Sequence, residues 1–284
     1  MLEGRYKADD TSLTVLLGDI TDGFAVQQAV LGKEIVFHLA ALIGIPYSYL
    51  APESYINTNV KGTLNVMEAC RRAGVERVVH TSTSEVYGTA QYTPIDEKHP
   101  LQGQSPYSAS KIGGDKIAES YYCSFGLPVA TLRPFNTFGP RQSTRAVIPT
   151  IITQALTSDT VRLGSLTPVR DLTFVSDTVQ AFIRMAECEQ AIGRTINAGR
   201  GSGVTIGELA EIILGKINPE ARIVCEEHRI RPEKSEVMKL ICDNSLARDT
   251  LGWSPSVTLE AGLDRAIAWM REQIDVYKPG VYTI

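Results

Sequence analysis

Two groups of polar residues have the types and spacing for acid–base chemistry on a small substrate. Thr83, Ser84 and Glu85 directly follow a short apolar run that predicts a buried strand. Tyr107 and Lys111 are four residues apart in a helical stretch, which places a phenol and an ammonium group on one helical face. Ligands in an open α/β sheet bind beyond the carboxyl ends of the strands, where the first group is expected to lie. These five residues are the candidate catalytic group.

The chemistry of this group depends on the electrostatics of Tyr107. A free tyrosine has a pKa of about 10 and is a poor base at neutral pH. We expect the Lys111 ammonium, and a nicotinamide cation beside it, to favour the phenolate and lower this pKa. The phenolate can then take the proton of a substrate hydroxyl while the carbon loses a hydride, and Thr83 can hydrogen-bond to the same oxygen. The alternative is a tyrosine packed on the sheet beside an exposed lysine, and the nearby Thr83 and Glu85 favour the catalytic interpretation.

The composition is that of an ordinary globular protein. The chain of 284 residues has 43% hydrophobic and 21% charged residues, which suits one large domain or two small ones. Its net charge of −4 and pI of about 5.7 argue against nucleic-acid binding, and no apolar run is long enough to predict a membrane span. Five cysteines without paired spacing favour reduced thiols in the cytoplasm, and four dispersed histidines predict no metal site.

Apolar runs alternate with helical stretches along the chain. Strands are predicted at 13–17, 34–41, 77–83, 128–132, 161–163 and 221–226. Helices are predicted after Asp22 and at 57–73, 108–125, 144–156, 174–187, 205–214, 245–251 and 259–273. The predicted helix caps are Asp22, Thr205 with Glu208, and Asn244. The alternation predicts an α/β protein with a parallel sheet and right-handed crossovers, in which the apolar run 34–41 is a central strand.

An ordered set of motifs runs from about Leu17 to the end of the chain. They lie at 38–41, 52–55, 59–63, 83–88, 107–111, 133–136, 138–141, 170–175 and 243–253. In these motifs the chain resembles the extended short-chain dehydrogenase/reductases, which include nucleotide-sugar epimerases, dehydratases and decarboxylases. The segments 43–48, 92–100, 142–149 and 231–236 most resemble one branch of that family. That branch is the NAD-dependent 4,6-dehydratases of nucleotide-activated N-acetylglucosamine in bacterial legionaminic-type sugar pathways.

The resemblance implies a Rossmann-like parallel sheet with a smaller α/β substrate-binding lobe. Residues 1–140 with 172–200 are expected to form the NAD-binding domain, and residues 141–171 with 201–284 the nucleotide-sugar-binding lobe. A glycine-rich loop that holds the cofactor pyrophosphate at a helix N-terminus does not precede Leu13. The first βαβ unit is therefore expected to be missing, and the chain is expected to bind NAD weakly. A truncation, a start codon assigned too late and a natural non-catalytic protein stay open, and the intact catalytic stretch favours the first two.

The resemblance also implies roles for individual positions. Tyr107 is the base, Lys111 its electrostatic support, Thr83 the hydroxyl partner and Glu85 the base for the sugar C5 proton. Guanidinium groups match phosphate oxygens, so arginines are the candidates for the diphosphate. The positions expected to contact the cofactor NAD are Asp19, Ile20, Leu39, Ala40, Ala41, Asn59, Thr81, Tyr107, Lys111 and Pro134. The positions expected to contact the nucleotide-sugar substrate are Tyr47, Ser48, Asn136, Arg141, Arg170 and Arg231.

The type of reaction stays open between related outcomes. In the 4,6-dehydratase reaction a C4 ketone acidifies the C5 proton, water leaves from C6, and the hydride returns there from the cofactor. Ser84 departs from the aspartate that the best-known hexose 4,6-dehydratases carry as the acid for the departing hydroxyl. A Ser-Glu pair also resembles nucleotide-uronate decarboxylases, and a C4 epimerase or an inactive binding protein are further alternatives. The family's dimer surface implies a homodimer through the helices 57–73 and 108–125.

Overall fold

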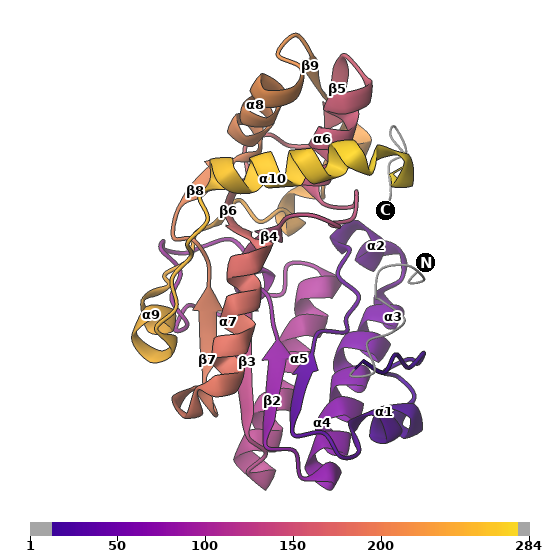
Figure 1. Ribbon diagram of the computed structural model, residues 1–284, viewed down its shortest axis with the longest axis vertical. Helices are drawn as coiled ribbons and strands as arrows, with labels where there is room; N and C mark the ends of the chain where they lie inside the picture. Colours follow the sequence, from indigo (N-terminus) through magenta and orange to yellow (C-terminus); the bar gives the residue numbers. More distant parts are fainter. Residues whose placement is uncertain (1–12, 278–284) are drawn as a thin grey trace.

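A parallel sheet of four strands forms the larger part of the molecule. The computed structural model describes residues 13–277, and Figure 1 shows this sheet at one end of the long axis. Its order is β1 (Ile35–His38), β2 (Arg77–Thr81), β3 (Val129–Pro134) and β7 (Thr195–Ala198), and every pairing in it is parallel. Helical crossovers between successive strands account for this arrangement. The predicted α/β class with a parallel sheet is confirmed.

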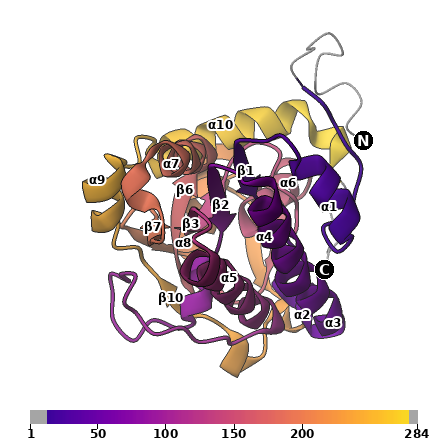
Figure 2. The same ribbon diagram turned by 90° about the horizontal axis from the view of Figure 1, so that it is seen from below.

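Helices cover both faces of this sheet (Figure 2). α1 (Gly23–Val30), α4 (Gly62–Ala73) and α5 (Pro106–Phe125) pack on one face through an apolar cluster that includes Met67 and Val78. α7 (Val175–Glu187) and α9 (Ser245–Leu251) pack on the other face through Met185 and Ile196. β2 and β3 are buried on both faces, which explains why they read as apolar runs in the sequence.

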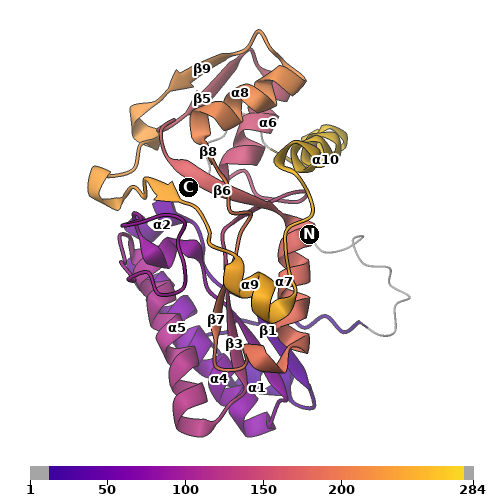
Figure 3. The same ribbon diagram turned by 90° about the vertical axis from the view of Figure 1, so that its left-hand side faces the viewer.

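A smaller part lies beyond the carboxyl ends of the main strands, as Figures 1 and 3 show. Its core includes five fully buried side chains, Ile151, Ile152, Leu209, Ile213 and Leu263. It contains α6 (Val147–Thr157), α8 (Ile206–Ile217) and α10 (Leu259–Glu272), with β5 (Thr160–Leu163) paired to β9 (Arg222–Cys225). A second sheet of β4 (Asn136–Phe138), β6 (Val169–Phe174), β8 (Gly203–Thr205) and β10 (Lys239–Leu240) joins the two parts.

Short segments complete the fold around the end of the main sheet. α2 (Ile45–Leu50) and α3 (Pro52–Tyr55) follow β1, and a π-helical turn η1 (Ile56–Lys61) leads into α4. The 3₁₀ turns are η2 (Ser84–Tyr87), η3 (Glu189–Ala191), η4 (Glu227–Arg229), η5 (Glu233–Ser235) and η6 (Ile274–Val276). No helix among residues 13–277 is long and apolar enough to cross a membrane.

The N-terminal part departs from the sequence predictions. Residues 13–17 form no strand, and the side chain of Leu17 is 93% exposed. β1 pairs only with β2 among the described strands, so it is an edge strand and not the predicted central one. Ile35 and Phe37 on this edge are 45% and 40% exposed. The physical reason is that no described strand lies beyond β1 to pair with its outer backbone groups or cover its side chains.

Most predicted helices and caps are confirmed, but α9 is capped by a different residue from the one predicted. Asp22 caps α1, and Thr205 and Glu208 form a capping box at the start of α8. Asn244 precedes α9, but its side chain donates to the Gly199 carbonyl at 2.9 Å instead of capping the helix. The cap is supplied by the neighbouring Asp243, which accepts from the Ser245 N–H at 2.9 Å. α9 lies in the segment 201–284 yet packs against the main sheet.

Asp177 anchors the segment that returns from the main sheet to the smaller part. Its carboxylate is buried and accepts from the Ser256 N–H at 3.0 Å, the Ser256 hydroxyl at 2.8 Å and the Val257 N–H at 2.9 Å. Asp177→Ala leaves these donors without their acceptor, so we expect the free energy of unfolding to fall by about 2–4 kcal/mol. Urea unfolding measures this loss.

The matched control is Asp264→Ala, which removes a carboxylate from the surface of α10. Asp264 is 62% exposed and pairs with Lys216 at 2.6 Å. Exposed ion pairs contribute little, so we expect this substitution to cost less than about 1 kcal/mol. Equal losses for the two variants would contradict the anchoring role of Asp177.

Candidate active site

Helix α5 places Tyr107 and Lys111 beside the end of β2. Ser105 caps the helix in a capping box with Ser108, and Pro106 occupies its first turn, so the helix starts one residue before Tyr107. Gly114 has no Cβ to collide with the Asn59 carbonyl, which lets α5 pack closely against η1. The side chains of Tyr107 and Lys111 are buried, and four-residue spacing puts them on the same helical face.

The 3₁₀ turn η2 directs Thr83 and Glu85 towards Tyr107. Thr83 has an extended backbone, and its hydroxyl accepts from the Glu85 N–H at 3.2 Å to cap the turn. Gly88 ends the turn with φ +63°, a conformation that favours glycine. A hydrogen bond with Thr83 lowers the pKa of Tyr107, and the Glu85 carboxylate raises it. The two polar groups found in the sequence therefore meet in one site.

The predicted low pKa of Tyr107 is wrong for this structure. Burial is the largest cause, and it raises the pKa of Tyr107 well above its usual value, with Glu85, Asp115 and Tyr55 adding to the rise. Burial disfavours the phenolate because the charge is removed from water. The Lys111 ammonium donates to the Thr81 carbonyl at 2.6 Å, so its charge is directed to the backbone of β2.

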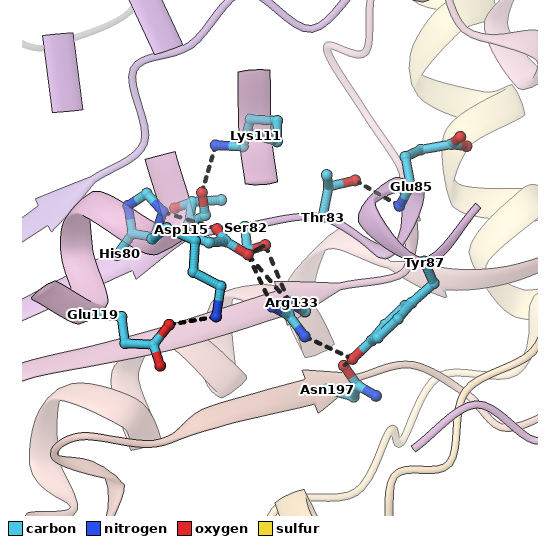
Figure 4. A network of polar contacts seen from close by, with 12 residues as sticks. His80, Ser82, Thr83, Glu85, Tyr87, Lys111, Asp115, Glu119, Arg133 and Asn197 are labelled. Carbon is cyan, nitrogen blue, oxygen red and sulfur yellow. Dashed lines mark hydrogen bonds and ion pairs between the residues drawn. The ribbon is translucent and has the colours of Figure 1, made fainter. Parts of the chain in front are cut away.

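Lys111 lies over a buried polar network, which Figure 4 shows. Asp115, one turn further along α5, accepts from the Ser82 hydroxyl at 2.6 Å and from Arg133 Nη2 at 3.0 Å. His80 Nε2 lies 3.1 Å from the other Asp115 oxygen. Burial lowers the pKa of Lys111, whereas the Asp115 carboxylate raises it. None of the three partners of Asp115 was among the predicted site residues.

Two of the predicted substrate arginines are brought together across the site. Glu236 accepts from Arg170 Nη2 at 3.2 Å and lies 3.4 Å from Arg231 Nη1. Burial lowers the pKa of Arg170, and the Glu85 carboxylate raises it, which places Arg170 close to the catalytic group. Arg141 is not part of this cluster: its side chain is exposed, and its backbone is left-handed with φ +70°.

The remaining predicted substrate positions differ in accessibility. Asn136 Oδ1 is buried and has no hydrogen-bond partner among the described residues, so it is available to a bound polar group. Tyr47 is 37% exposed on α2. Ser48 is fully buried and donates to the Ile45 carbonyl at 2.7 Å, because its hydroxyl points back along its own helix. The Ser48 hydroxyl is thus engaged within α2, and its contact with the substrate stays a prediction.

The predicted cofactor positions fall into accessible and structural groups. Leu39 and Ala40 are exposed beyond the end of β1, and Ala41 and Pro134 are half-buried at strand ends. Thr81 Oγ1 is buried without a partner in the described chain, beside the Lys111 ammonium. The unsatisfied hydroxyl and the small residues fit the nicotinamide-riboside end of a dinucleotide.

Three further cofactor positions are held in local structure. Asn59 is buried, bonds to both backbone groups of Leu42 and donates to Ser110 Oγ at 2.9 Å. Its amide thus fixes the loop after β1 against α5. Asp19 is exposed and accepts from the Thr21 N–H at 2.8 Å. The side chain of Ile20 lies against Gly62, where a Cβ would meet it at 2.5 Å.

A parallel sheet whose carboxyl end carries this Thr/Tyr/Lys group defines an enzyme of the Rossmann-like dehydrogenase class. Residues 2–266 match the family model described as GDP-mannose 4,6 dehydratase. The chain is 34% identical over 275 residues to a UDP-glucose 4-epimerase of Mycolicibacterium smegmatis, covering 94% of this chain and 82% of that protein. It is 32% identical over 263 residues to a dTDP-glucose 4,6-dehydratase of Streptomyces griseus, covering 92% and 79%.

A solved structure agrees with these relatives. A dTDP-glucose 4,6-dehydratase double mutant from Streptomyces venezuelae, crystallised with NAD, superposes with a TM-score of 0.86 at 29% identity, covering 95% of this chain and 83% of that one. The chain belongs to the NAD-dependent epimerase/dehydratase family of short-chain dehydrogenase/reductases. The family predicted from the motifs and its cofactor, NAD, are confirmed at this level.

The buried carboxylate of Asp115 generates a prediction for acid unfolding. Its pKa is lowered to about 2 from 3.8, because the hydrogen bond and charge of His80, the charge of Arg133 and the Ser82 hydroxyl outweigh burial. A lowered folded-state pKa stabilises the fold above about pH 4, and this contribution is lost as the pH falls through about 2. We expect a loss on the order of 2 kcal/mol between pH 4 and pH 2 in the wild type. Urea unfolding across this range measures it.

Asp115→Asn cannot titrate and provides the comparison. The other carboxylates are the same in both chains, so the difference between the two stability curves isolates Asp115. The curve of the variant is expected to be flatter between pH 4 and pH 2. Parallel curves would show that Asp115 titrates alike in the folded and unfolded chains.

Proposed function

We propose that the protein is an NAD-dependent 4,6-dehydratase of a nucleotide sugar, with UDP- or GDP-N-acetylglucosamine as substrate. The observation that carries the proposal is the meeting of Thr83, Glu85 and Tyr107 in one site, with Arg170 beside the Glu85 carboxylate. A hydroxyl, a carboxylate and a phenol are thus placed for successive proton transfers next to a group that can bind a diphosphate. The segments 43–48, 92–100, 142–149 and 231–236 support the N-acetylglucosamine branch.

Each member of the catalytic group has one proposed role. NAD, when bound, supplies the acceptor and donor of the hydride. Tyr107 takes the proton of the sugar O4 hydroxyl once it is ionised, and Thr83 hydrogen-bonds to the same oxygen. The Lys111 charge, and that of the nicotinamide when bound, would favour this ionisation against the effect of burial. Glu85 removes the C5 proton, which the C4 ketone acidifies, and water leaves from C6. The nicotinamide end is proposed to lie near Thr81, because the Thr81 hydroxyl lacks a partner in the described chain.

The two parts of the molecule divide the substrates between them in this proposal. Residues 1–140 with 172–200 are proposed as the NAD-binding domain, to which α9 adds by packing on the main sheet, and residues 141–171 with the rest of 201–284 as the lobe for the nucleotide sugar. Arg170 and Arg231 are held by a shared carboxylate, Glu236, and are proposed to bind the diphosphate. Asn136 and Tyr47 are proposed to contact the sugar, since one has an unsatisfied buried oxygen and the other is exposed beside the site.

Ser84 favours a second candidate reaction at the same site. A serine has no useful acidity at pH 7, so the protein lacks at this position the acid that would protonate a departing C6 hydroxyl. A nucleotide-uronate decarboxylase releases CO₂ and a C4 epimerase inverts one carbon, and neither reaction needs that acid. In the dehydratase, Glu85 serves both steps or a water molecule donates the proton.

The proposed assembly is a homodimer in a reducing compartment, the cytoplasm. The five cysteines are free thiols, in accord with such a compartment. α4 and α5 lie side by side on one face of the sheet (Figure 2) and are the proposed contact surface. Leu64 and Phe125, apolar residues of these helices, are 39% and 57% exposed. We expect light scattering to give twice the chain mass, and a monodisperse monomer would contradict the dimer.

Product analysis tests the function of the 284-residue chain. The protein is incubated with NAD and with UDP- or GDP-N-acetylglucosamine, and the product is followed by mass spectrometry and NMR. Dehydration is expected to give a 4-keto-6-deoxy sugar nucleotide lighter by one water. CO₂ release from a nucleotide uronate identifies the decarboxylase, and a product of unchanged mass identifies the epimerase.

Two further measurements sharpen this test. Tyr107→Phe removes the proposed base and is expected to lower kcat by about 10²–10⁴-fold. Glu85→Gln is expected to block water loss while leaving the first hydride transfer, seen as NADH absorbance without product. Calorimetric titration with NAD on the same preparation shows whether the cofactor binds. Bound NAD with no product from any of these substrates would rule the proposed activity out.

A further inference from the structure

The polar network behind Lys111 is more elaborate than helix packing requires. Asp115 is 5% exposed, and its two oxygens contact His80 on β2, Ser82 after β2 and Arg133 on β3. A single carboxylate therefore joins α5 to the two central strands. Figure 4 shows these groups below the Lys111 ammonium.

The network continues to the last strand of the sheet. Arg133 Nη1 donates to the Tyr87 hydroxyl at 3.0 Å, and Tyr87 donates to Asn197 Oδ1 on β7 at 2.7 Å. The guanidinium also lies over the Tyr87 ring at 5.0 Å from its centroid. Arg133 is thus fixed on every side, and its position in turn fixes Asp115.

Three spaced side chains of α5 connect this network to the candidate chemistry. Tyr107, Lys111 and Asp115 are four residues apart in succession, so they lie along one face of the helix. Lys111 reaches the Thr81 carbonyl at 2.6 Å, the backbone group that precedes Ser82. A shift of α5 along β2 would break the Asp115 and Lys111 contacts together.

The charges give Asp115 a second effect on Lys111. Arg133 and Lys111 are both buried cations, and the buried Asp115 carboxylate contacts Arg133 at 3.0 Å and lies one helical turn from Lys111 on α5. Arginine keeps its proton in proteins, so loss of the anion would be relieved by loss of the proton from Lys111. The Asp115 charge raises the pKa of Lys111 against the effect of burial.

We propose that Asp115 is a positioning residue for the candidate reaction: it sets the register of α5 on the sheet and supplies the negative charge that keeps Lys111 an ammonium group beside Tyr107. Asp115 touches no reacting atom and acts through Lys111. The proposal rests on the proposed function, since Lys111 has its catalytic role there. The titratable and charged groups that face Lys111, Tyr107 and Asp115 are His38, His80, Glu85, Tyr55, Tyr87 and Arg133.

The direct test follows the ionisation of Lys111 by NMR in the 284-residue chain, without substrate or NAD. Lysine labelled with ¹³C at Cε reports the protonation of each Nζ, and Lys111→Arg assigns the signal. In Asp115→Asn the pKa of Lys111 is expected to fall by about 1 or more, because a neighbouring anion is lost. An unchanged pKa in the folded variant overturns the proposal.

A matched control and a conservative variant separate this role from general effects of charge. Glu119 is on the next turn of α5, pairs with Lys116 at 2.6 Å and lines with Asp115 and Arg133 a cavity of about 290 Å³. Glu119→Gln is expected to leave the pKa of Lys111 unchanged, and an equal fall there would show a general charge effect. Asp115→Glu keeps the carboxylate and is expected to return the pKa at least halfway to the wild-type value.

A double variant tests the proposal if the single variant is unstable. If Asp115→Asn does not fold, Asp115→Asn/Arg133→Met takes its place, because no buried guanidinium is then left without a partner. A fall in the pKa of Lys111 is still expected because the anion is absent, but a smaller one than in Asp115→Asn, since the Arg133 cation is removed with it. A wild-type value in the double variant overturns the proposal.

Kinetics provide the readout that links Asp115 to catalysis. In Asp115→Asn, kcat is expected to fall at least about tenfold while KM for the nucleotide sugar changes less than about threefold. The fall of activity at high pH is expected to begin at a lower pH, by the amount seen for Lys111 in the NMR titration. A wild-type pH profile overturns the positioning role. Absence of dehydratase activity in the wild type overturns the proposed function instead and leaves the NMR result standing.

Discussion

The buried contact between Asp115 and Arg133 is the interaction on which the site depends. Buried ion pairs often add little net stability, because removing two charges from water is costly, but breaking one leaves an uncompensated buried charge. This asymmetry makes the pair a strict constraint on geometry. Its oxygen and nitrogen atoms lie 3.0 Å apart between α5 and β3. In any other register of the helix the carboxylate and the guanidinium would be separated, and each charge would stay buried without its partner.

The helix that this contact fixes is the one that carries Tyr107 and Lys111. Gly114 permits the close approach of α5 to η1, and Ser105 sets where the helix begins. Small residues, a cap and a buried charge thus specify one position for α5 in three independent ways. A site built from side chains on such a helix keeps its geometry because the scaffold, and not the ligand, determines it.

The smaller part of the molecule approaches the same site from the opposite side. β6 carries Arg170 to the neighbourhood of Glu85, and Glu236 holds Arg170 and Arg231 together. Glu236 balances two positive charges that would repel each other in a site with little water. A diphosphate carries the same kind of charge as Glu236, so binding would exchange or share the partners of both arginines. Asp177 fixes the segment that links the two parts, which gives the opposing groups a defined separation.

The fold class, most helices and the placing of Tyr107 beside Lys111 could be predicted from sequence because local signals determine them. Apolar runs marked β2 and β3, and spacing of four placed Tyr107 beside Lys111 on one helix. The pKa of Tyr107 could not be predicted, since the extent of its burial and the hydrogen bond of Lys111 to Thr81 arise only from tertiary packing. His80, Asp115 and Arg133 were likewise missed as a group, because residues on three different elements carry no shared sequence pattern.

The exposed edge of β1 has a consequence for the behaviour of the chain in solution. Its outer backbone N–H and C=O groups pair with no other described strand, and Ile35 and Phe37 lie partly exposed on it. An extended segment of another molecule can add to such an edge through backbone hydrogen bonds and cover these side chains. The strand is thus a template for intermolecular β-pairing, with no lysine or proline in its four residues to deter association. In concentrated solutions of the chain, this intermolecular β-pairing competes with the native state.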